Sequence, residues 1–67
     1  MKSLNLRQAI ISRVQDKSDE ELMEVIEGSV GHDERSLPGL GVLFEVIWQN
    51  LGDRQRQELV SVLKSNL

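Results

Sequence analysis

The sequence contains no cysteine and no tyrosine, and only one histidine, one proline, one tryptophan and one phenylalanine. Without cysteine, a disulfide scaffold, a thiolate metal site and a cysteine nucleophile are excluded, and the composition fits a reducing compartment. No run approaches the roughly 20 apolar residues of a membrane-spanning helix, and the N-terminus lacks the apolar stretch of a signal peptide. We therefore expect an intracellular protein with no membrane partner.

The chain is 67 residues long, and 39% of them are apolar. This length allows one domain, residues 1–67, because domains typically span roughly 100–150 residues. A single core of this size seldom stabilises a chain unless disulfides, a metal or a second subunit contribute. Because disulfides are excluded, we expect a homo-oligomer, most simply a homodimer.

The formal net charge is −3, and it is unevenly distributed. Residues 18–34 contain seven acidic residues and no lysine or arginine, whereas the segments on either side carry a small positive charge. Affinity for nucleic acid depends mainly on lysine and arginine that neutralise phosphates. The acidity therefore argues against a nucleic-acid partner, although a basic patch at either end of the chain stays open.

Two amphipathic helices are expected in the first half of the chain. The apolar residues of the first recur at spacings of three and four, as on one helical face: Leu6, Ala9, Ile10 and Val14. Asn5 is its expected N-cap, with Ser3 as the alternative. The second begins with a capping box formed by Ser18 and Glu21, and Gly31 is expected to end it. Its apolar face comprises Leu22, Val25, Ile26 and Val30.

The segment 37–50, Leu-Pro-Gly-Leu-Gly-Val-Leu-Phe-Glu-Val-Ile-Trp-Gln-Asn, is predicted to form a third helix, because Pro38 suits a first helical turn. Its apolar residues, extended by Leu51, occupy positions i, i+3, i+4, i+7, i+8 and i+11: Leu40, Leu43, Phe44, Ile47, Trp48 and Leu51. The β-branched and aromatic content makes a strand the competing interpretation, but the helical spacing favours a helix. A helix that is apolar on nearly all sides is covered in a core or between subunits. We interpret Gly39 and Gly41 as room for close helix packing.

A fourth helix is expected after Gly52, with Asp53 as its cap. Its apolar residues are Leu59, Val60 and Leu63, while Arg54 and Arg56 are expected to point outward and Lys64 lies near the C-terminal end. The predicted fold is therefore all-α: a small bundle of about four short helices, completed by homodimerisation.

Little in the sequence indicates chemistry. The single histidine, His32, stands beside Asp33 and Glu34, but three neighbouring residues in a polar linker lack the geometry of a metal site, so we interpret them as solvated. The acids of the second helix are interpreted as its wet face, and Phe44 and Trp48 as packing residues rather than a base-stacking platform. We expect no enzyme, no catalytic residue, no metal and no cofactor.

The segment 37–50 resembles the signature of the I-type small acid-soluble spore proteins, minor components of the endospores of Bacillus-like bacteria. Residues 4–11, Leu-Asn-Leu-Arg-Gln-Ala-Ile-Ile, resemble the opening of that family, and the acidic second helix, the linker and the length agree. The resemblance implies a protein made in the forespore and found in the spore core. It also implies a difference from the abundant α/β-type spore proteins that coat DNA.

The expected function is that of a non-enzymatic structural or protein-interaction component in sporulation. The residues expected to carry it, by packing and self-association, are Leu40, Leu43, Phe44, Ile47, Trp48 and Leu51. The alternative is a weak DNA-associated spore protein that uses basic residues of the first or last helix, of which Arg54, Arg56 and Lys64 form the best patch.

Overall fold

The computed structural model describes residues 5–67, which form four α-helices and one short 3-10 helix. The elements are α1 (Leu6–Val14), α2 (Asp19–Ser29), η1 (Glu34–Ser36), α3 (Leu37–Gln49) and α4 (Asp53–Ser65). Over this range there is no strand. The all-α prediction is confirmed, and the segment for which a strand was the competing interpretation is the helix α3.

The first two helices begin as their sequences predict. Asn5 caps α1, and its Oδ1 accepts a hydrogen bond of 2.7 Å from the backbone N–H of Gln8. Ser18 and Glu21 form the expected capping box, because Ser18 Oγ accepts from Glu21 N at 3.2 Å and Glu21 Oε1 accepts from Ser18 N at 2.9 Å. The alternative cap, Ser3, lies outside the described residues.

Glycine and proline mark the later boundaries. Gly31 has φ +69° just after α2, a conformation that glycine adopts without steric cost. Pro38 lies in the first turn of α3 as expected. The prediction that Asp53 caps α4 is wrong: the N-cap is Gly52, whose N–H donates to Gln55 Oε1 at 3.3 Å. Asp53 is already the first helical residue, so its charge meets the positive end of the helix dipole.

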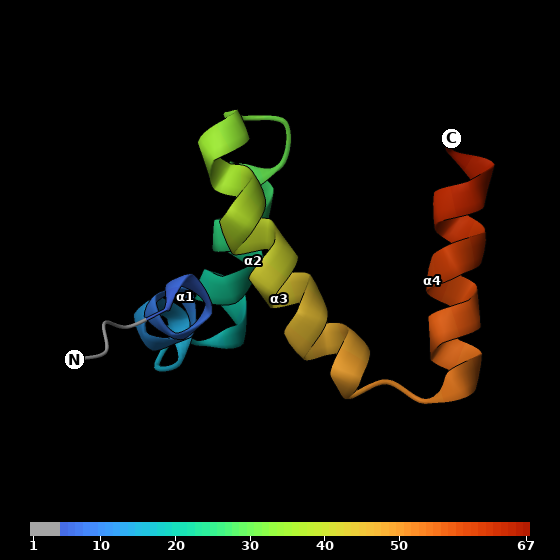
Figure 1. Cartoon of the computed structure of the whole chain (residues 1–67), viewed down its shortest axis with the longest axis horizontal. Helices are drawn as coiled ribbons and strands as arrows, with labels where there is room; N and C mark the ends of the chain where they lie inside the picture. Colours follow the sequence, from blue (N-terminus) through green and yellow to red (C-terminus); the bar gives the residue numbers. More distant parts are fainter. Residues whose placement is uncertain (1–4) are drawn as a thin grey trace.

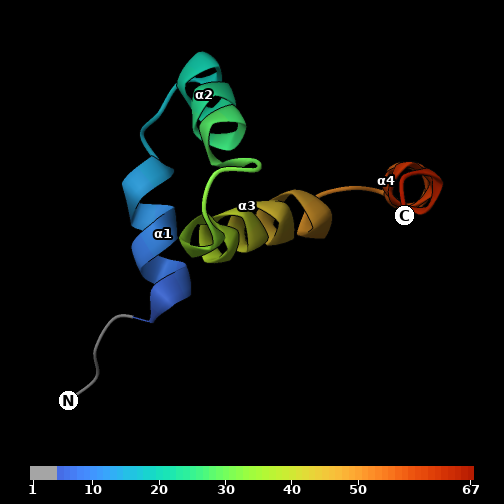
Figure 2. The same ribbon diagram turned by 90° about the horizontal axis from the view of Figure 1, so that it is seen from above.

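The helices form a loose bundle at one end of the molecule and leave the last helix apart from it. In Figure 1, α1 and α2 lie beside α3, whereas α4 stands on the far side of a short connection after the end of α3. Figure 2 shows the same separation from above. The principal extents are 42 × 26 × 24 Å, so the molecule is elongated.

Little of the chain is buried. Among residues 5–67, Val42 alone is buried, with 8% of its surface exposed. An exposed ion pair connects α1 to α3: Nε and Nη2 of Arg7 donate to the two carboxylate oxygens of Glu45 at 2.7 and 3.0 Å. Burial in α3 is therefore much narrower than its apolar sequence suggests.

Candidate interaction surface

The structure divides the predicted apolar stripe of α3 between two sides of the helix. Leu43 faces α1 and α2, where it lines a groove together with Ile10 and Val25. Phe44 and Trp48 instead line a second groove, between α3 and α4. Of the six predicted residues, Leu40, Leu43, Trp48 and Leu51 are half-buried, while Phe44 and Ile47 are 50% and 44% exposed.

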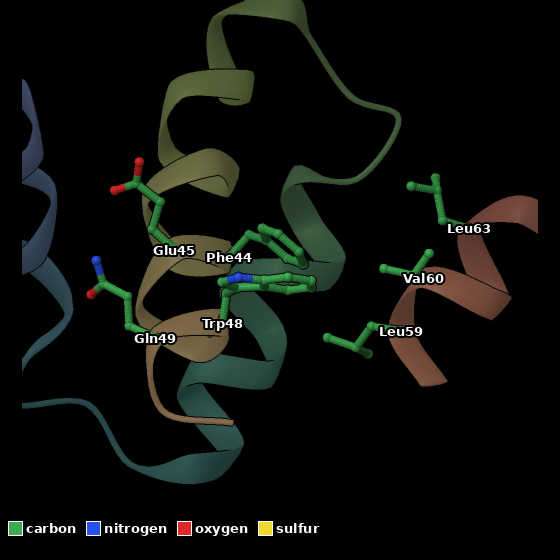
Figure 3. Close-up of a pocket in the computed structure, with 7 residues that line it drawn as sticks. All are labelled: Phe44, Glu45, Trp48, Gln49, Leu59, Val60 and Leu63. Atoms are coloured by element: carbon green, nitrogen blue, oxygen red, sulfur yellow. The ribbon is translucent and has the colours of Figure 1, made fainter. Parts of the chain in front are cut away.

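The groove between α3 and α4 has a volume of about 520 Å³. Its lining residues are Phe44, Glu45, Trp48, Gln49, Leu59, Val60 and Leu63. Figure 3 shows the two aromatic rings projecting from α3 toward three aliphatic side chains on α4, while the carboxylate and the amide point away from α4. The surfaces that face each other across the groove are therefore apolar.

The two aromatic rings of the groove lie against each other. The ring centroids of Phe44 and Trp48 are 5.5 Å apart, and the ring planes are inclined by 37°. This pair follows from the helical spacing, since residues i and i+4 are neighbours on a helix surface. Such pairs add a preferred geometry to the burial of apolar area, so the pair forms a broad apolar wall on α3.

Arg56 joins the two helices beside Trp48. Its Nε donates to the carbonyl oxygen of Trp48 at 3.0 Å, and its guanidinium carbon lies 5.4 Å from the centroid of the Trp48 ring. Arg56 is half-buried, so the prediction that it points outward is wrong. The available signal was its spacing, because Arg56 precedes Leu59 by three residues and Leu63 by seven on the same face of α4.

Asp33, one of the three linker residues considered for a metal site, is paired with an arginine. Asp33 binds Arg35, which donates to its carboxylate from Nε at 3.2 Å and Nη2 at 2.9 Å. These bonds, with a third from the backbone N–H of Arg35, hold the pKa of Asp33 below its ordinary value. Within the part of the chain that the structure describes, no three His, Asp or Glu side chains gather as metal ligands.

Two other carboxylates, Glu21 and Glu45, have lowered pKa values because their charged forms accept hydrogen bonds. The backbone N–H of Ser18 lowers the pKa of Glu21 by binding its charged form. The Arg7 guanidinium lowers the pKa of Glu45 in the same way, and Glu45 raises that of Arg7.

The glycines of α3 do not bring helices together. A Cβ atom added at Gly39 or Gly41 would meet nothing within 4 Å. The interpretation of both as residues that allow close helix packing is therefore wrong. The reason is that α1 and α2 leave open space beside the first turns of α3.

None of the helices in residues 5–67 has the length and apolarity needed to cross a membrane.

Comparison with known proteins gives one consistent result. The family described as "Small, acid-soluble spore protein I" matches residues 4–67. Proteins of that name from Bacillus mycoides and Bacillus cereus are each 41% identical over 66 residues, which cover 97% of this chain and 96% of theirs. One from Bacillus anthracis is 39% identical over the same length and coverage. No solved structure matches the chain significantly.

Proposed function

Since the chain belongs to the small, acid-soluble spore protein I family and is thus a spore protein, we propose that it acts in sporulation as a non-enzymatic component of the forespore and spore core. It works through contact with protein, first of all with itself. The residues expected to carry this contact are Leu40, Leu43, Phe44, Ile47 and Trp48 of α3, together with Leu51 just after it.

The observation that supports this function is the apolar surface that α3 leaves uncovered. Phe44 is 50% exposed beside Trp48, on the wall of an apolar groove. Aromatic side chains are enriched at the centres of protein interfaces, because they bury much area in few rotatable bonds. A partly exposed aromatic pair on the most apolar helix of a 67-residue chain therefore fits a contact surface better than a catalytic pocket.

The DNA-associated alternative gains no support from the basic residues. Two of the cations it would use are already engaged, Arg7 with Glu45 and Arg56 with Trp48. The seven acids of residues 18–34 would repel phosphate. DNA binding is therefore the less favoured function, and a DNA titration tests it.

Sedimentation at micromolar concentration tests the proposal. We expect a species of twice the 7.6 kDa chain mass that dissociates on dilution. A compact, stable monomer at every concentration would refute self-association. A parallel titration of duplex DNA should give no binding at low salt, whereas an affinity that falls steeply with salt would favour the alternative.

A further inference from the structure

We propose that the groove between α3 and α4 binds a second copy of this chain, so that two copies cover each other's groove around a two-fold axis. The inference rests on the proposed self-association and adds its location. It also adds three residues of α4 to the interface, Leu59, Val60 and Leu63, which the apolar stripe of α3 does not include.

The exposed area of the chain is the first reason. A compact protein of 7.6 kDa exposes about 4,300 Å² by the scaling of surface with mass, whereas this chain exposes 5984 Å². The excess is roughly 1,700 Å², and about 1,000 Å² remains after subtraction of the largest area that residues 1–4 can contribute. If each of two copies buried this excess, the interface would be about 2,000 Å², the size at which obligate homodimer interfaces begin.

The two helices of the groove contribute to this exposed area. Every residue of α4 is exposed except the half-buried Arg56. Val60 and Leu63, which face the groove, are 49% and 57% exposed, and Phe44 on the opposite wall is 50% exposed. Exposed apolar side chains therefore stand on both walls of the groove.

The chain does not close the groove by itself. The connection between the helices, residues 50–52, is tied at both ends: Asn50 Nδ2 donates to the carbonyl oxygen of Val46 at 2.7 Å, and Gly52 N–H donates to Gln55. Arg56 then inserts its guanidinium beside the Trp48 ring. These contacts fix the end of α4 beside Trp48, while Val60 and Leu63 further along α4 stay exposed.

A second copy fits the groove because the facing surfaces are uncharged and the same on both partners. In a two-fold arrangement each chain offers the apolar faces of α3 and α4 and receives the same faces, so both grooves are covered at once. The carboxylate of Glu45 points away from α4 and is paired with Arg7. It therefore brings no like charges together across the axis.

A matched pair of substitutions on α4 tests the location. Val60 and Val62 are both exposed valines of the same helix, but only Val60 lines the groove. We expect Val60→Glu to raise the Kd of the dimer at least tenfold, because it places an unpaired carboxylate in a covered apolar surface. Val62→Glu makes the same change of charge and should alter Kd less than twofold. Leu63→Glu should repeat the effect of Val60→Glu, and circular dichroism checks that all three variants keep the helicity of the wild type.

Trp48 supplies an independent measurement, because it is the only tryptophan and the chain has no tyrosine. Its emission in the wild type should shift to the red on dilution with the same midpoint as dissociation in sedimentation. A dimer weakened equally by Val60→Glu and Val62→Glu would overturn the groove as the interface and leave self-association intact. A monomer would overturn both: blue Trp48 emission at all concentrations would show α4 closed onto its own α3, and red emission that turns blue only with another protein would show a different occupant.

Discussion

Val42 and Val46 lie one turn apart on α3 and differ mainly in how much of each side chain is exposed. The exposed fraction is 8% for Val42 and 43% for Val46. Replacing each with alanine removes the same two methyl groups from the same helix. If the packing of α3 against the N-terminal helices stabilises the fold, the two substitutions must have unequal costs. They therefore measure how much of the stability of the chain rests on its small core.

The expected magnitudes follow from the exposed fractions. Complete burial of two methyl groups is worth about 1.6 kcal/mol, while alanine returns about 0.5 kcal/mol through its higher helix propensity. For Val42→Ala, almost the whole burial is lost, so the free energy of unfolding should fall by about 1 kcal/mol. For Val46→Ala, little more than half was present, and the fall should be about 0.4 kcal/mol.

Urea unfolding followed by circular dichroism gives both values at one protein concentration, so that association contributes equally. For a chain of this size, the loss in Val42→Ala corresponds to a fall in Tm of about 4–8 °C. Equal losses in the two variants, or a larger loss in Val46→Ala, would refute the assignment of the core. Such a result would mean that α3 is covered at least as completely at Val46 as it is one turn earlier, at Val42.

Three further predictions concern the caps, the ion pairs and the groove. Ser18→Ala should lower the free energy of unfolding by about 1 kcal/mol through loss of the cap of α2. The control Ser12→Ala, in the exposed middle of α1, should not lower it. The urea midpoints of the two variants and the wild type measure the difference. Because the pKa of Glu45 is lowered from 4.5 in the folded state, its pairing stabilises the fold above that pH and the effect is lost as pH falls through the lowered value. Thermal melts between about pH 6 and 3 should therefore show a shallower decline for Glu45→Gln than for wild type, and parallel declines would contradict the pairing. Arg56→Ala should cost about 1–2 kcal/mol and shift Trp48 emission, whereas unchanged emission would mean that the guanidinium does not cover the ring.

The helix boundaries were predictable because their signals are local. Asn5 and Ser18 bind backbone groups three residues later, and Pro38 needs only the free N–H positions of a first turn. Such interactions depend on nearby sequence alone. The predicted N-cap of α4, Asp53, was wrong because the adjacent residues Gly52 and Asp53 both suit a cap. The side chain of Gln55 accepts the N–H of Gly52 and so favours Gly52 as the cap.

The division of α3 between two neighbours was not predictable from spacing. Leu43 and Phe44 are adjacent and equally apolar, yet they face α1 and α2 in one case and α4 in the other. Periodicity identifies an apolar face but not the element that covers it, since this depends on the directions of the other helices. The same limit explains Arg56, which is polar in the sequence but lies on the apolar face of α4. It also explains Gly39, where the neighbouring helices leave room for a Cβ atom.

The placement of core and groove on a single helix constrains what any substitution in α3 can mean. Val42 and Phe44 are two residues apart and about 200° apart around the helix axis, so one faces the buried side and the other the groove. A second copy seated in the groove binds α3 only while α1 and α2 hold it folded, and its binding in turn stabilises that folded state. Folding and association are then linked through α3. A loss of the dimer after a change at Val42 would therefore report on the stability of the fold. The same loss after a change at Val60 reports on the interface, because Val60 belongs to a helix that takes almost no part in the core.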